Sequence, residues 1–291
     1  MFSGTITALI TPFEAGSKGT KIDFDALSSL IEWQLDCGIN GFVVCGTTGE
    51  SATLTTDEKL ALFKHVVKNV RGRVPVIAGT GSNNTAASVE LTSSAKKCGV
   101  DGVLAVTPYY NKPTQAGLIQ HFSAIADVGV PTILYNIPGR VVIDISNETF
   151  NVLADHKSIV AVKEASGSAA KLLELAQTVG GRLELLSGED HMTYFVMAAG
   201  GTGVISASSN AIPTAMCSIT NAMAEGDFNQ GREAQLAALP AIKALFIETN
   251  PAPAKAVLAA SKRIACEDLR LPLVPVSQQN REILLDTVAV A

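Results

Sequence analysis

The sequence predicts a (β/α)8 barrel, in which eight parallel strands close on themselves inside a ring of helices, followed by a small C-terminal helical domain. Short apolar runs rich in β-branched residues recur eight times, and a longer amphipathic stretch follows each run. Eight such units in a little over two hundred residues match a closed barrel better than an open sheet. The first run is followed by Thr11-Pro12-Phe13, not by the glycine-rich turn of an open dinucleotide-binding sheet.

The expected strands are short and are bounded by glycine, proline or polar residues. Runs of this kind are typical of strands that are buried on both faces of a parallel sheet. In chain order they cover residues 5–10, 41–45, 74–78, 102–106, 131–135, 159–163, 183–186 and 203–206.

Polar capping residues and glycines mark the ends of the first helices. The expected helices run over residues 26–37 with Asp25 as the cap, from Thr56 to 70, from Asn84 or Thr85 to 98, and onward from Ser146 or Asn147. Glycines at positions 38, 72 and 99 are expected to stop the first three of these helices.

The barrel is expected to occupy residues 1–226, and residues 227–291 are expected to form the helical appendage. Helical patterning in the appendage covers residues 231–248 and 252–262 and resumes at Gln278. The stretch between Asp190 and Glu225 has no Asp, Glu, Lys or Arg, but glycines, serines and a proline interrupt it. Since no apolar span of about 18 residues survives, we expect buried and packed elements there, not a membrane span.

Composition narrows the class of function. The net charge of -5 and an isoelectric point near 5.4 argue against nucleic acid as a partner, which needs clustered Lys and Arg. The five cysteines are widely spaced and form no Cys-x-x-Cys pair, and the histidines show no metal-binding spacing. The amino terminus lacks the basic segment of a signal peptide. These features predict a cytoplasmic protein without a metal site, acting on small molecules.

Lys163 ends the apolar run over residues 159–163, just before a turn-like Glu164-Ala165-Ser166-Gly167. The strand therefore delivers an amine to the barrel rim where such folds carry their chemistry. Burial can lower a lysine pKa by about 3 to 5 units, and each unit multiplies the nucleophilic fraction about tenfold. The alternative is an ordinary lysine that reaches into solvent. Reactive polar groups at other strand ends favour a Schiff-base lysine.

Three other strand ends carry groups suited to acidic substrates. The loop Gly46-Thr47-Thr48-Gly49 combines glycines, whose backbone amides can face an anion, with two hydroxyl donors; a plain turn is the alternative. Tyr110 and Tyr135 lie at the ends of the fourth and fifth strands, where a phenol beside a buried amine can transfer protons or simply pack in the core. Arg140 can bind a carboxylate through two hydrogen bonds, or it can be an ordinary surface cation.

Taken in order, six motifs resemble the dihydrodipicolinate synthase family, within the pyruvate-dependent class I aldolases. The resemblance runs essentially from end to end of the chain. The motifs are Gly46-Thr47-Thr48-Gly49-Glu50, Pro108-Tyr109-Tyr110, Tyr135-Asn136-x-Pro138-x-Arg140, Val162-Lys163-Glu164-Ala165, Gly201-x-Gly203-Val204-Ile205-Ser206, and Asn250-Pro251-x-Pro253-x-Lys255 with Leu269-Arg270-Leu271-Pro272-Leu273.

The resemblance implies a proton-transfer and imine-forming set. Lys163 would form an imine with pyruvate, and Tyr135 would act as acid and base in turn. Thr47 would bridge Tyr135 and Tyr110 in a proton relay. Tyr110 would enter from a neighbouring subunit, so the complete site would exist only in a dimer.

The resemblance also implies binding residues and partners. Thr47 and Thr48 would surround the pyruvate carboxylate, Arg140 would hold the carboxylate of L-aspartate 4-semialdehyde, and backbone groups of Gly188 and Ile205 would line the pocket. Condensation of the two substrates would give 4-hydroxy-tetrahydrodipicolinate, the first committed step toward diaminopimelate and lysine, without a metal or organic cofactor. The family is typically a homotetramer of two tight dimers, with Tyr109 in the tight interface.

Two alternatives to this reading stay open. One is a sister aldolase that acts on N-acetylneuraminate or a 2-keto-3-deoxy sugar acid. Thr47, where sialic acid lyases usually carry serine, and the pair Tyr110 and Arg140 favour the synthase. The other is a non-catalytic barrel that only binds small acids, since one fold hosts many functions.

Lysine-inhibited members of the family bind lysine in a pocket at the tight dimer interface. Asn83 and Tyr109 match that pocket, but its histidine positions hold Thr56 and Lys59 and its acidic position holds Ala87. Exchange of a carboxylate for a methyl group, together with a new ammonium, disfavours a cationic ligand. The sequence therefore predicts weak or absent feedback by L-lysine.

Overall fold

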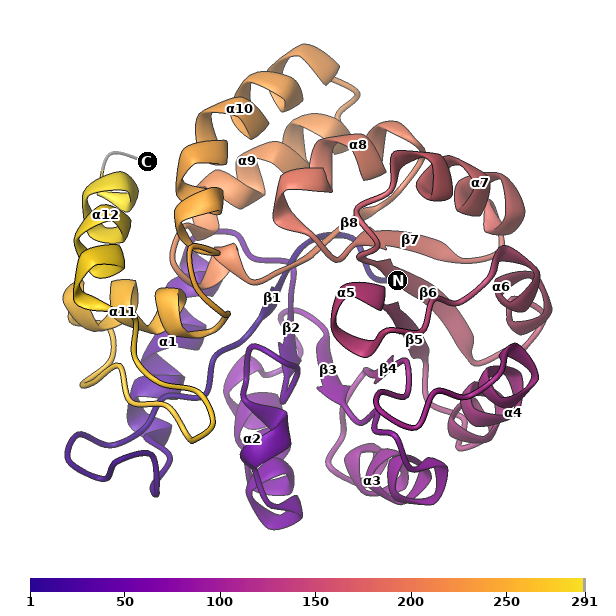
Figure 1. Ribbon diagram of the computed structural model, residues 1–291, viewed down its shortest axis with the longest axis horizontal. Coiled ribbons are helices and arrows are strands. Elements are labelled where there is room, and N and C mark those ends of the chain that lie inside the picture. The colour runs from indigo at the N-terminus through magenta and orange to yellow at the C-terminus, as the bar shows by residue number, and fades with distance from the viewer. Residues whose placement is uncertain (290–291) are drawn as a thin grey trace.

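Eight parallel strands close into a barrel in the computed structural model, which describes residues 1–289. Each strand pairs with the next along the chain, and β1 pairs with β8 to complete the ring. Figure 1 shows this ring with helices around it, which confirms the predicted fold class. The strands are β1 Gly4–Ala8, β2 Gly41–Val44, β3 Val76–Gly79, β4 Gly102–Val106, β5 Thr132–Asn136, β6 Ile159–Glu164, β7 Glu184–Ser187 and β8 Gly203–Ser206.

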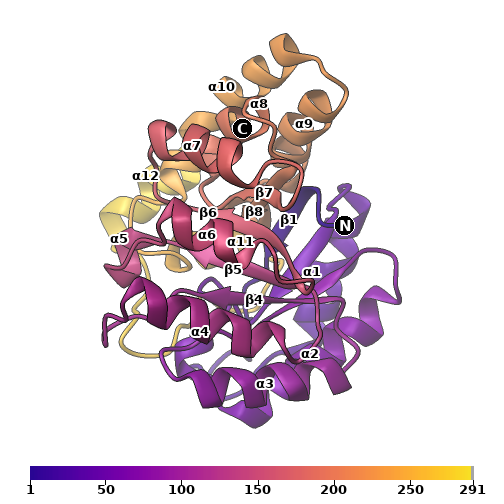
Figure 2. The same cartoon turned by 90° about the vertical axis from the view of Figure 1, so that its right-hand side faces the viewer.

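The helices alternate with the strands and cover the outside of the barrel, as the side view in Figure 2 shows for α3, α4 and α6. The α-helices are α1 Phe24–Asp36, α2 Thr56–Val70, α3 Thr85–Lys97, α4 Gln115–Ala126, α5 Pro138–Val141, α6 Asn147–Leu153, α7 Ala169–Val179, α8 Thr193–Ala198, α9 Pro213–Ala224, α10 Phe228–Ala244, α11 Ala252–Ala260 and α12 Gln278–Val288. Three short 3-10 helices are η1 Ser51–Thr53, η2 Asp190–Met192 and η3 Ser208–Asn210.

Several element ends differ from the sequence prediction. Asp23 caps α1 by accepting a hydrogen bond from the amide of Ala26 at 2.8 Å, whereas Asp25, the expected cap, lies in the first turn. Asp25 still suits that turn because a negative charge there favours the helix dipole. The first strand ends at Ala8, earlier than residue 10, and the helix expected over 231–248 is α10, which Asp227 caps.

Alternate positions of the strands fill the barrel interior with apolar side chains. Members of this inner cluster come from all eight strands and include Ile6, Val43, Ile77, Leu104, Ile133, Ala161, Leu186 and Ile205. Ala161 and Ala165 both belong to the cluster. Since side chains two residues apart lie on the same face of a strand, Lys163 between them also points inward.

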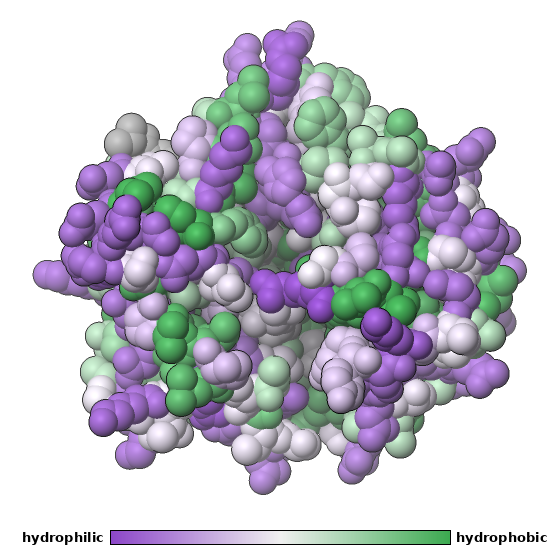
Figure 3. Space-filling view, in the orientation of Figure 1, coloured by the Kyte–Doolittle hydropathy of each residue, from purple (hydrophilic) through white to green (hydrophobic). Residues whose placement is uncertain are grey.

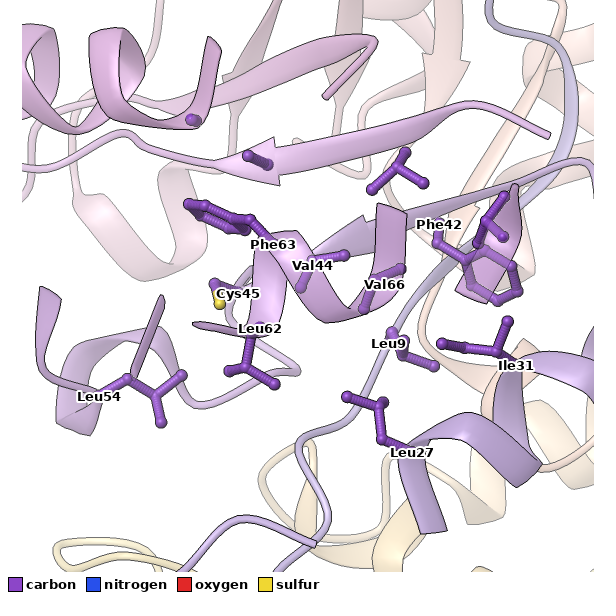
Figure 4. Close-up of a cluster of buried hydrophobic side chains, with 14 of the residues drawn as sticks. Leu9, Leu27, Ile31, Phe42, Val44, Cys45, Leu54, Leu62, Phe63 and Val66 are labelled. Atoms are coloured by element: carbon purple, nitrogen blue, oxygen red, sulfur yellow. The ribbon is translucent and has the colours of Figure 1, made fainter. Parts of the chain in front are cut away.

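A second core lies between the strands and their outer helices. Figure 4 shows part of it, where Ile31 of α1 lies near Phe42 of β2, and Leu62 and Phe63 of α2 lie near Cys45. Burial of each large apolar side chain contributes about 1.5 to 3 kcal/mol to stability. The amphipathic stretches between the strands are therefore the outer layer that holds the barrel closed.

The C-terminal helices pack against the barrel through a shared core. Ile10, Leu30 and Val204 of the barrel belong to one buried cluster with Ile242 and Leu258 of the appendage. The boundary after residue 226, which remains a proposal, falls in the turn between α9 and α10. Within residues 1–289, the helices lack the length and apolar character that crossing a membrane requires.

Candidate active site

Strand β6 places the amine of Lys163 inside the barrel, near its C-terminal end. The side chain is only 6 % exposed. Burial lowers the pKa of Lys163 to about 8; the charge of Asp190 opposes this shift, and the charge of Arg140 adds to it. About one amine in ten is then neutral at pH 7, against fewer than about one in a thousand for an ordinary lysine. The structure therefore places a buried amine with a lowered pKa at the rim position expected from the sequence.

Tyr135 lies directly beside that amine. It pairs in register with Lys163 across β5 and β6, and the Lys163 Nζ atom lies 4.1 Å from the centroid of its ring. Burial raises the pKa of the Tyr135 phenol above its usual range, against the opposing charge of Arg140. The phenol therefore stays protonated at neutral pH and is available as a proton donor next to the lysine.

The loop after β2 folds into a tight turn that presents two threonines. The amide of Gly49 donates to the carbonyl of Gly46, and the amide of Glu50 donates to the carbonyl of Thr47. These two hydrogen bonds close the turn, so the amide of Gly49 is engaged within the loop. The two threonine side chains supply hydroxyl donors. Thr47 is exposed and Thr48 is buried, and both line the central cavity.

Gly188 allows the chain after β7 to pass close to Lys163. Its amide donates to the carbonyl of Glu164 at 2.7 Å. A Cβ atom at this position would lie 2.7 Å from the Cβ of Ala165 and 3.1 Å from the Cγ of Lys163. Only glycine fits without displacing the lysine. Ile205 of β8 completes this wall, and both residues line the cavity.

The cavity above these residues has a volume of about 1020 Å³ and lies at the C-terminal ends of the strands. Figure 3 shows that this face of the molecule has a hollow near its centre. Arg140 of α5 is exposed and lines the cavity. Tyr109 also lines it, but the described residues around the cavity do not include Tyr110, whose side chain is 90 % exposed. One chain alone therefore does not bring Tyr110 to Lys163.

The sequence of the whole chain resembles one protein family. Residues 1–291 match the family model described as the dihydrodipicolinate synthetase family. The chain belongs to this family. It is 46 % identical over 285 residues to the 4-hydroxy-tetrahydrodipicolinate synthase of Pelobacter propionicus, covering 98 % of this chain and 97 % of that relative.

Two solved structures of the family show the same architecture. Dihydrodipicolinate synthase from Aquifex aeolicus superposes with a TM-score of 0.95 at 42 % identity, covering 99 % of this chain and 97 % of that one. The chloride-inhibited enzyme from Acinetobacter baumannii, complexed with pyruvate, superposes with a TM-score of 0.96 at 38 % identity, covering 100 % of both chains.

Behind the reactive groups, a buried polar network fixes the ends of β5 and β6. The Asn136 side-chain amide donates to the carboxylates of Glu164 at 2.9 Å and Asp144 at 2.8 Å. Its oxygen accepts from the amide of Ile145 at 3.1 Å. Because Asn136 and Glu164 follow in register after Tyr135 and Lys163, this network holds the two strands that carry the tyrosine and the lysine.

Sequence reasoning assigned no role to two buried polar residues of the cavity. Asp190 is 2 % exposed, and its Oδ2 atom accepts hydrogen bonds from the amide and hydroxyl of Ser208 at 2.9 and 2.8 Å. Asn250 donates to Thr48 from the appendage. The position of Asp190 just after a predicted strand could have marked it as a candidate site residue. No local pattern around Asn250 indicates its contact with Thr48.

Two of the residues that resemble the lysine pocket, Lys59 and Tyr109, line the same cavity. Lys59 belongs to α2, and burial lowers the pKa of its side chain. Asn83 is half-buried and its carbonyl accepts from Asn111 at 2.9 Å. Thr56 and Ala87 are exposed. Lys59 is therefore the member of the set that places a charge next to the cavity.

Proposed function

We propose that this chain condenses pyruvate with L-aspartate 4-semialdehyde to give 4-hydroxy-tetrahydrodipicolinate and water, the first committed step toward diaminopimelate and lysine. The observation that carries this proposal is the buried amine of Lys163, with its lowered pKa, under the ring of Tyr135. Membership of the dihydrodipicolinate synthetase family and similarity to 4-hydroxy-tetrahydrodipicolinate synthases support the choice of substrates.

The first half of the reaction activates pyruvate. The neutral amine of Lys163 attacks the keto carbon, and loss of water gives a protonated imine. The imine withdraws electrons from the neighbouring methyl group, so a methyl proton leaves and an enamine forms. Tyr135 donates a proton to the departing oxygen and accepts one in return. Thr47 and Thr48 donate hydrogen bonds to the pyruvate carboxylate from the loop after β2.

The second half joins the two substrates. The enamine carbon attacks the aldehyde carbon, and the aldehyde oxygen takes a proton and becomes a hydroxyl group. The amino group of the second substrate then attacks the imine carbon and displaces Lys163, which closes the ring and restores the free amine. Arg140 at the rim holds the carboxylate of the aldehyde substrate. Gly188 and Ile205 shape the wall beside the reacting carbon.

Substrate choice tests this proposal. The chain should consume pyruvate with L-aspartate 4-semialdehyde and show no turnover with N-acetylmannosamine, measured as ring product and as loss of pyruvate. Arg140→Ala should lower kcat/KM for the aldehyde about 10- to 150-fold, which is the loss of a charged hydrogen bond worth about 1.5 to 3 kcal/mol. It should leave imine formation with pyruvate intact. Turnover with the sugar and none with the semialdehyde would establish the sister activity instead.

We also propose that the enzyme works as a homotetramer of two tight dimers, in which Tyr110 completes the site of the partner subunit. The exposed Tyr110 side chain has a left-handed backbone conformation with φ +72°, and the half-exposed Tyr109 lies beside it. A large exposed aromatic residue is typical of an interface anchor. In the partner's cavity, Tyr110 relays protons to Tyr135 through Thr47.

Mixing two inactive variants tests this arrangement. Lys163→Ala lacks its own amine, and Tyr110→Phe supplies no relay hydroxyl to its partner. Dissociated and reassociated together, they should recover about a quarter of wild-type activity, since random pairing makes about that share of the sites complete. Each variant reassociated alone is the control. No gain over the two separate variants would place Tyr110 outside the reaction.

Feedback by L-lysine should be weak or absent. Lys59 carries an ammonium group at the edge of the cavity where a cationic ligand would have to bind. The two positive charges would repel each other. The measurement is the steady-state rate against L-lysine concentration, for wild type and for Lys59→Gln. The variant should be the more sensitive of the two. Half-inhibition of the wild type at submillimolar L-lysine would contradict this prediction.

A further inference from the structure

Asn250 is one of the appendage residues that line the cavity. Its side-chain Nδ2 atom donates a hydrogen bond to the Oγ1 atom of Thr48 at 2.8 Å. Both residues are almost fully buried, at 7 % and 3 % exposure, and both line the cavity. They are 202 positions apart in the sequence. A buried contact of this kind therefore joins the C-terminal segment directly to a group that faces the substrate.

The direction of this hydrogen bond sets what the hydroxyl of Thr48 can do. A hydroxyl group has one donor hydrogen and two acceptor lone pairs, whereas an amide nitrogen only donates. Asn250 therefore occupies a lone pair of the Thr48 oxygen and leaves the hydroxyl hydrogen free. Because Thr48 lines the cavity, that hydrogen is available to an acceptor there. An anionic acceptor makes the stronger bond.

The same C-terminal segment also fixes the loop from behind. Lys255 of α11 is fully buried and forms an ion pair with Glu50 at 2.5 Å. The amide of Arg270 donates to the other oxygen of the Glu50 carboxylate at 2.9 Å. Asn250 thus acts on a loop whose backbone is already held in place, so its own contact governs the orientation of one hydroxyl.

We infer that Asn250 is a positioning residue that holds the Thr48 hydroxyl as a hydrogen-bond donor to the carboxylate of the keto acid substrate. This inference rests on the proposed function, since it takes the keto acid to react at Lys163. It adds a requirement that the proposed function does not contain. The C-terminal segment contributes to recognition of the acid group, and not only to packing of the barrel.

Imine trapping with two ketones isolates this role. Pyruvate carries the carboxylate and acetone does not, while both can form an imine with Lys163. Borohydride reduction followed by mass measurement gives the ketone concentration for half-maximal labelling. The variants are Asn250→Ala, which removes the donor, and Asn250→Asp, which has the same size but accepts the Thr48 hydrogen and repels an anion. The matched control is Asn280→Ala, because Asn280 makes a similar amide bond to Glu248 at 2.8 Å in the appendage.

The effect should be confined to the acid. Asn250→Ala should raise the half-saturating pyruvate concentration about tenfold and Asn250→Asp about a hundredfold. These changes correspond to the usual range for loss of a hydrogen bond to a charged group. Acetone labelling should stay within about twofold of the wild type, and Asn280→Ala should change neither ketone. In a Thr48→Val background, Asn250→Ala should add little further loss, because the two residues act as one unit.

The outcomes separate this inference from the function beneath it. If wild-type Lys163 is not labelled by pyruvate, the proposed function fails. If wild-type labelling is normal and the Asn250 variants keep its pyruvate dependence, the inference fails and the function stands. Equal losses for pyruvate and acetone, or full additivity with Thr48→Val, would also overturn it, because they indicate a general structural effect. Should Asn250→Ala unfold, the equal-sized Asn250→Asp decides alone.

Discussion

Lys163→Ala should abolish the covalent pyruvate adduct and lower turnover about a thousandfold or more. The variant removes the only group at the centre of the cavity that the reaction uses as a nucleophile, and other bound dipoles can supply only residual catalysis. The measurement is intact mass after treatment with pyruvate and borohydride, followed by peptide mapping, alongside the steady-state rate. Wild-type protein should gain one pyruvate-derived remnant per chain, located at Lys163.

Two further variants sharpen this test. Lys163→Arg keeps a positive charge but cannot form an imine, so it should be as inactive as the alanine variant if covalent chemistry carries the reaction. Lys64→Ala removes an exposed lysine of α2 and should change nothing. An adduct that maps to Lys112 or Lys171 in the wild type would show that the site has been assigned to the wrong residue. Substantial activity in the arginine variant would point to electrostatic catalysis without an imine.

Local sequence patterns were sufficient to predict the barrel and the position of Lys163 at the end of a buried strand. An apolar run of β-branched residues that ends in Lys163 and a turn predicts both the strand and its rim position. The resemblance supplied the identities of Tyr135 and Thr47, whereas the pattern alone left their core and turn alternatives open. The structure adds the surroundings of Lys163, which is buried beside Tyr135 and has its pKa lowered to about 8 by that burial.

Errors at element ends have a local physical cause. Asp23 and Asp25 are both good helix caps, and the choice between them depends on which backbone amide each can reach. The structure selects Asp23, which bonds to the amide of Ala26. Propensity cannot rank two equivalent acids two positions apart.

Contacts between distant segments escape sequence reasoning for another reason. Asn250 and Thr48, or Lys255 and Glu50, meet only because the appendage folds back onto the barrel. The two members of each pair are more than two hundred positions apart, so no helical or strand periodicity indicates that they meet. Lys163 and Lys255 are both buried, yet Lys255 is paired with Glu50 whereas Lys163 lies beside Tyr135, and the sequence alone does not distinguish these two environments.

Lys255→Met should destabilise the fold by about 3 to 5 kcal/mol, the usual cost of removing one partner from a buried ion pair. Lys255 and Glu50 have side chains that are 0 % and 1 % exposed. The ammonium also donates to the carbonyl of Asp268 at 2.8 Å and lies 4.1 Å from the centroid of the Phe13 ring. Without it, the carboxylate of Glu50 keeps the amide of Arg270 but loses its counter-charge.

Denaturant unfolding, monitored by fluorescence and circular dichroism, measures that cost. The matched control is Arg281→Met, because Arg281 and Glu267 pair at 3.4 Å in the same appendage while remaining partly exposed. A pair of that kind should contribute less than about 1 kcal/mol. Adding Glu50→Gln to Lys255→Met should recover much of the lost stability, since it removes the unpaired charge. A loss below about 1 kcal/mol for Lys255→Met, equal to the control, would mean that the Glu50 charge is relieved by another group and that the pair does not hold the threonine loop in place.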